Sequence, residues 1–103
     1  MPKRGEVWWS EHPEMGRRPV LVLTRSEAIP ILRRLSVAPA TRTVRHIPTE
    51  VLVGPEEGMP TECAFSFDNV TLLPRGYLVD LICTMGPEVM QLACRAMAAA
   101  FDC

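Results

Sequence analysis

Apolar residues along this chain come in short blocks that are separated by proline, glycine and polar turns. The run Val-Leu-Val-Leu at residues 20–23 predicts a strand over residues 18–24 that is buried on both faces, since no polar side alternates with it. Alternating side chains predict two more strands, over residues 34–41 and 63–67. Further short strands are expected at residues 5–9, 48–54, 70–73 and 79–83.

The segments between these strands have the composition of turns and loops. Loops are predicted at residues 10–16 (polar), 25–33, 42–47 (basic) and 55–62 (acidic). The second of them is expected to contain one helical turn over residues 27–29. Pro39 has no N–H to donate to a neighbouring strand, so the strand 34–41 is expected to have an edge or a bulge near its end.

The last block of the chain predicts a helix. Gly86 is suited to the N-cap, Pro87 to the first helical position, and Glu88 to the positive end of the helix dipole. Apolar residues then recur at the spacing of a face packed on a core: Val89, Ala93, Ala96, Met97 and Ala100. Short strands with one terminal helix predict a mainly β fold with α, namely a small, mostly antiparallel barrel formed as a single domain by residues 1–103.

Length, composition and charge limit the class of protein. The 103 residues suffice for one modest core, and an apolar content of 48% argues against disorder. No apolar run approaches the length of a membrane span and no signal peptide is visible, so a soluble, cytoplasmic protein is expected. Residues 1–45 carry nine Lys/Arg against four acids, whereas residues 46–103 carry two against eight. This asymmetry suits a phosphate-bearing partner on one face, or self-association.

The four cysteines form no Cys-x-x-Cys pair and lie far from both histidines in sequence. Neither a zinc site nor a disulfide framework is therefore indicated. A free cysteine in an apolar segment behaves as a small hydrophobic residue. Cys63, Cys83 and Cys94 are expected to be reduced thiols in the core, with Cys103 at the surface, and no metal is expected to be bound.

A cluster of charged and polar side chains is predicted where the strands 18–24 and 34–41 meet. If they pair antiparallel through their short connection, Arg18 at the start of the first becomes a neighbour of Thr41 at the end of the second. The flanking loops reach the same rim and bring the candidates Glu11, His12, Glu14, Arg42, Arg45 and His46. A cationic rim with a hydroxyl and proton carriers is typical of a phosphodiester site.

The motifs, taken in order, resemble one family. Nearly the whole chain follows the pattern of the MazF/PemK (Kid) toxin endoribonucleases, through MPKRGEVWW, GRRPVLVLTR, VAPATRTVRHIPTEV, FDNVTLLPRGYL and a final helix after GPEVM. The resemblance implies a homodimeric SH3-like barrel, shared with the gyrase poison CcdB. It also implies metal-independent, sequence-specific cleavage of single-stranded RNA to a 2′,3′-cyclic phosphate and a 5′-hydroxyl, with no cofactor, and neutralisation by a cognate MazE-like antitoxin.

The resemblance assigns roles to particular residues. The family's arginine before the strand proline falls on Arg18, and its threonine at the end of the next strand falls on Thr41. In the resulting hypothesis the RNA 2′-OH attacks the adjacent phosphorus, Arg18 stabilises the growing charge, and Thr41 donates a hydrogen bond to a phosphoryl oxygen. RNA-binding residues are expected among Glu11, His12, Arg17, Arg42, Thr43, Arg45 and His46.

The identity of the general base is open at this stage. Arginine is a poor base, so a second hypothesis uses His12 and His46 as a base and acid pair. Many relatives carry a longer first loop with a Gly-Ser-Glu-Gln motif. Here that loop is shortened to residues 10–16, so that Glu11 and Glu14 are only candidates for its glutamate.

Two other functions are compatible with the pattern. One is a CcdB-like poison that binds DNA gyrase and cuts nothing, although residues 101–103 lack the Trp-Gly-Ile ending by which such toxins engage gyrase. The other is a catalytically silent relative that only binds its antitoxin. Trp8, Trp9 and Phe65 are expected to pack in the core rather than to stack on bases.

Overall fold

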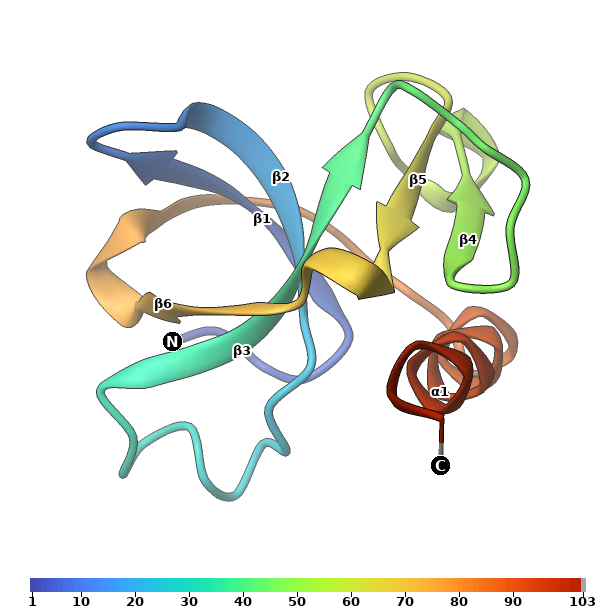
Figure 1. Cartoon of the computed structure of the whole chain (residues 1–103). Coiled ribbons are helices and arrows are strands. Elements are labelled where there is room, and N and C mark those ends of the chain that lie inside the picture. Colours follow the sequence, from blue (N-terminus) through green and yellow to red (C-terminus); the bar gives the residue numbers. More distant parts are fainter. Residues whose placement is uncertain (103) are drawn as a thin grey trace.

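A computed structural model describes residues 1–102 of the chain (Figure 1). Within this range seven strands, three short 3₁₀ turns and one α-helix follow one another. The strands are β1 (Glu6–His12), β2 (Gly16–Val22), β3 (Arg34–Thr41), β4 (Glu50–Val53), β5 (Cys63–Ser66), β6 (Thr71–Pro74) and β7 (Leu78–Thr84). The 3₁₀ turns are η1 (Pro55–Glu57), η2 (Phe67–Asn69) and η3 (Arg75–Tyr77), and the helix is α1 (Pro87–Phe101). The predicted mainly β fold with a C-terminal helix is confirmed.

The strands form one curled sheet with β3 near its middle. The order is β4-β5-β3-β2-β1-β7, with β6 also paired to β3, and every pair is antiparallel. In Figure 1 the end of β3 rises at the top, whereas the connection that precedes β3 lies at the bottom. The start of β2 and the end of β3 therefore both lie at the end of the molecule opposite that connection.

The first hairpin is longer than the sequence predicted. β1 extends to His12, and β2 begins at Gly16, so the segment 10–16 is mostly strand rather than a polar loop. Polar contacts rather than alternating apolar side chains link the two strands there. For example, Ser10 donates a hydrogen bond to the carbonyl of Arg18 at 2.9 Å. Polar residues on both strands obscure the alternation on which the prediction relied.

The central strand β2 is buried on both faces, as predicted. Leu21 and Leu23 pack in the cluster that lies against α1. Val20 and Val22 pack in a second cluster on the opposite side of the sheet. Each of the four is at most 5% exposed, so substitution of any of them would leave a cavity in one of the two clusters.

Pro39 marks the point at which β3 changes partner. β3 pairs with β6 as far as Val37 and with β5 from Ala40 onwards. Pro39, which has no N–H to donate, falls between the two ladders. The irregularity that the proline predicted therefore takes the form of a switch between strands, and this switch turns the end of β3 towards β5.

The connection 25–33 contains hydrogen-bonded turns and no helix, which corrects the predicted helical turn. The N–H of Ala28 reaches the carbonyl of Arg25 at 3.0 Å, and the N–H of Ile29 reaches that of Ser26 at 3.3 Å. Ala28 and Ile29 are buried, so the turns close the bottom of the barrel. The remaining strands begin or end within about two residues of their predicted bounds, apart from the extended β1 described above, as is usual for pattern-based boundaries.

The helix α1 begins as the sequence predicted, with Gly86 at the N-cap and Pro87 at the first position. Ala93 and Ala96 are fully buried against β4 and η2, and Val89, Met97 and Ala100 pack beside them. No helix within residues 1–102 is long and apolar enough to cross a membrane.

The cysteines differ in part from the prediction. Cys63 is a buried free thiol and Cys83 is half-buried. Cys94 is exposed on the outer side of α1 instead of lying in the core, because the inward stripe of the helix consists of its neighbours Ala93 and Ala96. Cys103 lies outside the described residues.

Candidate functional site

Arg18, near the start of β2, and Thr41, at the end of β3, line the same cavity. The two strands pair antiparallel from Val22 facing Val37 to Val20 facing Pro39, so the start of β2 and the end of β3 lie at the same end of this ladder. The shared cavity has a volume of about 370 Å³. The predicted pairing of these strands is confirmed, and it brings the two candidate catalytic residues together.

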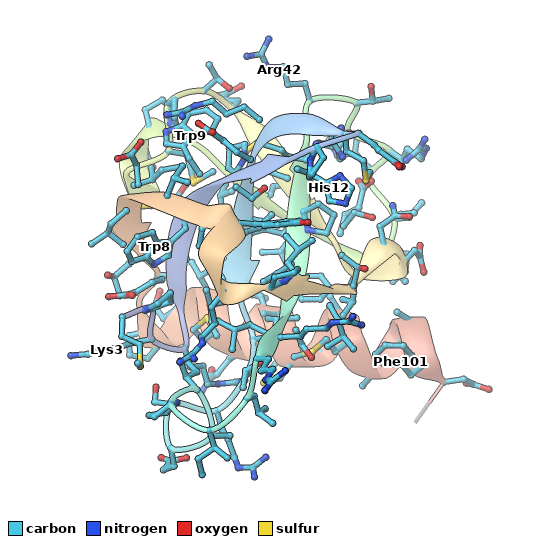
Figure 2. The ribbon with its side chains drawn as sticks, turned by 90° about the vertical axis from the view of Figure 1, so that its left-hand side faces the viewer. Lys3, Trp8, Trp9, His12, Arg42 and Phe101 are labelled. Carbon is cyan, nitrogen blue, oxygen red and sulfur yellow. The ribbon has the colours of Figure 1, made fainter. Side chains whose placement is uncertain are left out.

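The lining of this cavity is cationic and rich in hydroxyl groups. It consists of Trp9, Arg17, Arg18, Pro19, Ala40, Thr41, Arg42, Thr43, Met59, Pro60, Thr61 and Cys63. This set contains three guanidinium groups and three threonine hydroxyls, and it contains no carboxylate. Figure 2 shows Trp9 and Arg42 towards one end of the molecule, with Lys3 nearer the other. A planar guanidinium offers paired donors to phosphate oxygens, so the cavity, referred to below as the arginine cavity, is suited to a phosphate-bearing ligand.

Arg17 is already engaged by protein groups at the mouth of the arginine cavity. Its guanidinium lies 2.8 Å from the carboxylate of Glu11 and 3.4 Å from that of Asp80, and it lies over the ring of Trp9 at 4.8 Å. Both ion pairs are exposed and therefore contribute little to stability, but together with the cation–π contact they fix the direction of the side chain.

Arg18 and Arg42 are the uncompensated charges of the arginine cavity. Among residues 1–102 neither of them forms an ion pair with a carboxylate, and both are exposed. An anion that enters the cavity can therefore bind these two guanidinium groups without breaking an existing ion pair. This difference separates Arg18 from the adjacent Arg17, in line with the sequence-based choice of the arginine that precedes Pro19.

The hydroxyl of Thr41 has a defined orientation. Its Oγ accepts a hydrogen bond from the N–H of Thr43 at 3.1 Å, which closes a turn directly after β3. A threonine hydroxyl has two acceptor positions and one proton, so the proton remains available when one acceptor position is occupied. Thr41 can therefore donate into the arginine cavity, while Thr43 contributes its backbone.

His12 has a structural role at the tip of the first hairpin. Its Nδ1 accepts the N–H groups of Glu14 at 3.1 Å and Met15 at 3.2 Å, so the proton of the neutral ring lies on Nε2. The ring meets Tyr77 edge-to-face, with 5.5 Å between the centroids. Neither His12 nor Glu14 lines the arginine cavity.

The loop 42–47 separates two cavities. Arg42 and Thr43 line the arginine cavity, whereas Val44 and His46 line a second cavity of about 510 Å³ that has three glutamates in its wall. Arg45 lies beside Glu50, with its Nη1 3.9 Å from a carboxylate oxygen. Arg18, Thr41 and Arg42 thus share a cavity that His12, Arg45 and His46 do not line. Fewer of the candidate residues come together than the sequence predicted.

Several residues of the site were absent from the sequence-based prediction. Thr61 and Met59 reach the arginine cavity because β5 pairs with β3, and Asp80 reaches Arg17 because β7 pairs with β1. Long-range strand order brings these residues in, and no local motif signals it. Glu50 was predicted within a strand, and the burial of its side chain became visible only in the folded chain.

Cys63 lies at the boundary between the two cavities and lines both. Burial raises the pKa of its thiol, nearby Cys83 acts in the same direction, and Arg42 opposes the shift. Burial, followed by Glu57, likewise raises the pKa of Cys83. Both thiols are therefore neutral near pH 7 and unsuited to act as nucleophiles. Within residues 1–102 no group of three or more metal-ligating side chains comes together.

The fold and the arginine cavity together define a small barrel with a cationic cavity at one end. The chain belongs to the family of PemK-like, MazF-like toxins of type II toxin-antitoxin systems, which matches residues 3–101. It is 42% identical over 104 residues to the "Probable endoribonuclease MazF5" of Mycobacterium tuberculosis (strain ATCC 25618 / H37Rv), covering 100% of this chain and 95% of the relative.

Other relatives agree with this family assignment. The "Probable endoribonuclease MazF2" of the same strain is 35% identical over 102 residues, covering 98% of this chain and 99% of the relative. The solved "Mycobacterium tuberculosis toxin MazF-mt6" is 32% identical with a TM-score of 0.87, covering 94% of this chain and 96% of that chain. A structure titled "Endoribonuclease in complex with its cognate antitoxin from Mycobacterial species" gives a TM-score of 0.89 at 25% identity, covering 99% of this chain and 96% of that chain.

Proposed function

We propose that this toxin is an endoribonuclease that cleaves single-stranded RNA at short sequences without a metal ion. The observation that carries the proposal is that Arg18 and Thr41 line one cavity together with Arg17 and Arg42. The curated relatives named as endoribonucleases match this chain over almost its full length, which adds independent support. The family resemblance implies the same reaction.

The proposed reaction uses the nucleophile that RNA itself supplies. The 2′-oxygen attacks the adjacent phosphorus, the bond from phosphorus to the 5′-oxygen breaks, and the products are a 2′,3′-cyclic phosphate and a 5′-hydroxyl. Arg18 stabilises the charge that grows on the phosphoryl oxygens, and the Thr41 hydroxyl donates to a non-bridging oxygen. Donors fixed in this way before the reaction typically contribute a factor of about 10²–10³ each to the rate.

The remaining cations are proposed to bind rather than to react. Arg42 lies at the same cavity without an ion pair within residues 1–102, so it is suited to hold a neighbouring phosphate. Arg17, Thr43 and Arg45 are proposed to make further contacts with the backbone of the RNA. His12, His46 and Glu11 have no role in the proposed reaction, because none of the three lines the arginine cavity. They are proposed to bind RNA or to hold the local structure.

The proposal extends to partners and setting. Residues 1–103 are proposed to act as a single toxin domain in the cytoplasm, as a homodimer. An acidic, MazE-like antitoxin is proposed to cover the cationic end of the barrel, since charge complementarity favours that face. The solved relative in complex with its cognate antitoxin supports this partner class.

The test is a digest of long mixed-sequence RNA in excess EDTA. The wild type is compared with Arg18→Ala and Thr41→Ala, and Arg95→Ala on the exposed side of α1 serves as a matched arginine control. Mapping of new 5′-hydroxyl ends is expected to give cuts at one short motif for the wild type and the control. The two site variants are expected to lose these cuts.

Two results would overturn the proposal. Folded wild-type protein that makes no cuts would move the assignment to a gyrase-directed or catalytically silent toxin, and trapped gyrase–DNA adducts would then separate these two. Cuts that persist in both site variants would place the chemistry elsewhere on the surface.

A further inference from the structure

Glu50, the first residue of β4, has a buried carboxylate that binds a loop rather than another strand of the barrel. Its side chain is 2% exposed. One oxygen accepts the backbone N–H of Arg45 at 2.8 Å. The other has no hydrogen-bond partner among the described residues, and the Arg45 guanidinium lies 3.9 Å away. Both groups that face the carboxylate thus belong to one residue of the loop 42–47.

Such a carboxylate is costly for the fold. Removing a charge from water is unfavourable unless hydrogen bonds and an opposite charge compensate it, and here the compensation is incomplete. Replacement of a buried, incompletely paired charge by an apolar side chain of similar volume is often neutral or stabilising. The carboxylate is therefore best explained by what it holds, which is the backbone of Arg45.

The loop 42–47 is fixed at three points. At its start the N–H of Thr43 is bound by the hydroxyl of Thr41, and at its end the N–H of Glu50 reaches the carbonyl of Ile47 at 3.0 Å. The bond from Arg45 to Glu50 ties the middle. His46 follows in a left-handed conformation with φ of 54°, which costs energy for a residue with a side chain and persists only where neighbours impose it.

We propose that Glu50 is the positioning residue of this loop, and that it sets the shape in which Arg42 and Thr43 face the arginine cavity. The loop separates the two cavities, so a change of its path moves Arg42 relative to Arg18 and also frees the turn that orients the Thr41 hydroxyl. Glu50 itself does not line either cavity. The inference rests on the proposed function in that the ligand of the arginine cavity is an RNA phosphate.

The test uses binding without cleavage. The probe is a single-stranded DNA 20-mer of mixed sequence, which has the phosphates but lacks the 2′-hydroxyl. Glu50→Leu removes the acceptor at similar size, whereas Glu50→Gln keeps an oxygen that can accept from Arg45. Thr49→Val is the matched control, because it removes another bond at the start of β4, from Thr49 to Asp68 at 2.6 Å, without touching the loop.

Glu50→Leu is expected to weaken binding of the 20-mer by about tenfold, the effect of losing a hydrogen bond to a charged group. Its plot of log affinity against log salt should flatten by about 0.7 for each phosphate contact that is lost. Glu50→Gln should stay within about threefold of the wild type, since a neutral acceptor remains. Thr49→Val should keep the wild-type slope.

Hydrogen exchange gives a second test that needs no apolar variant. The Arg45 amide lies in an exposed loop, yet it should exchange slowly in the wild type and in Glu50→Gln. Fast exchange of this amide in the wild type would overturn the inference, as would wild-type affinity and salt slope in folded Glu50→Leu. If the wild type binds the 20-mer in this manner but cuts no RNA, the endoribonuclease proposal fails while the role of Glu50 stands.

Discussion

The guanidinium of Arg17 lies 4.8 Å from the centre of the Trp9 ring, and this contact separates the roles of two adjacent arginines. Arg17 is also bound to Glu11 and Asp80, whereas Arg18 forms no ion pair within residues 1–102. The charge of Arg17 is thus largely compensated by the protein. Of these two arginines, only Arg18 brings a guanidinium without an ion pair among residues 1–102 to the cavity that Thr41 also lines.

Replacement of these two arginines should have unequal effects. Arg18→Ala is expected to lower the single-turnover rate of RNA cleavage by about 10²–10³, since it removes a donor that acts in the transition state. Arg17→Ala should lower mainly affinity, by less than about tenfold, because the residue gives up existing partners when it binds a phosphate. Rates at saturating and at low RNA concentration separate the two effects. Equal losses in both variants would contradict the distinction.

The Thr41 hydroxyl should matter where the Thr43 hydroxyl does not. Thr41→Val is expected to reduce the cleavage rate by about 10²–10³, whereas Thr41→Ser keeps the donor and most of the rate. Thr43→Val keeps the backbone N–H that binds Thr41 and should stay near the wild type. The same single-turnover assay measures all three. A Thr43→Val variant as slow as Thr41→Val would show that the orientation argument is wrong.

The histidine hypothesis gives a prediction that can be checked by the pH–rate profile. His12 is occupied by the N–H groups of Glu14 and Met15, and His46 lines the second cavity. Neither is placed to move a proton at the arginine cavity. His12→Ala and His46→Ala should therefore keep the cleavage rate and the shape of the profile between about pH 5 and 9. Loss of one limb of a bell-shaped profile in either variant would restore the base and acid pair.

The centre of the site could be predicted from the sequence because its determinants are local. An apolar run, a proline and a short connection were enough to pair β2 with β3 and to bring Arg18 and Thr41 to one cavity. The start of α1 followed from Gly86 and Pro87 for the same reason. Side chains next to one another in a hairpin need no knowledge of the rest of the fold.

The parts that were missed depend on distant strands or on polar contacts. Asp80 meets Arg17 only because β7 is placed beside β1, and strand order of this kind leaves no local trace. Glu50 alternates with the inward Val51 and should face solvent, but the loop 42–47 folds over it. The hairpin residues 10–16 lack apolar alternation, because ion pairing and hydrogen bonds hold their strands together.

The two inner thiols should make stability fall at alkaline pH. Burial raises the pKa of Cys63 and of Cys83 in the folded state, so the folded protein keeps protons that the unfolded chain releases above about pH 8.5. Their contribution is present below that pH and is lost as pH rises through the folded pKa. Urea unfolding under reducing conditions at pH 7.5 and pH 10 measures the change.

The change of unfolding free energy between these pH values should be smaller in Cys63→Ala than in the wild type. Cys94→Ala is the control, because it removes an exposed thiol on α1 rather than one of the two inner thiols. The comparison uses differences between two pH values, so the cost of the substitution itself cancels. The same pH dependence in all three proteins would mean that burial of Cys63 does not govern its titration.

Gly58 approaches Cys83 closely, directly before Met59, which lines the arginine cavity. A Cβ added at Gly58 would lie 2.8 Å from the Cβ of Cys83, and the backbone there has φ of 98°, which residues with side chains rarely adopt. Gly58→Ala is therefore expected to lower the free energy of unfolding by about 1–3 kcal/mol, measured by urea denaturation. Gly76→Ala is the matched control, since nothing lies within 4 Å of its added Cβ. Because Met59 follows Gly58 and lines the arginine cavity, the same variant should also weaken oligonucleotide binding. If Gly58→Ala keeps the full stability of the wild type, this turn is free to move.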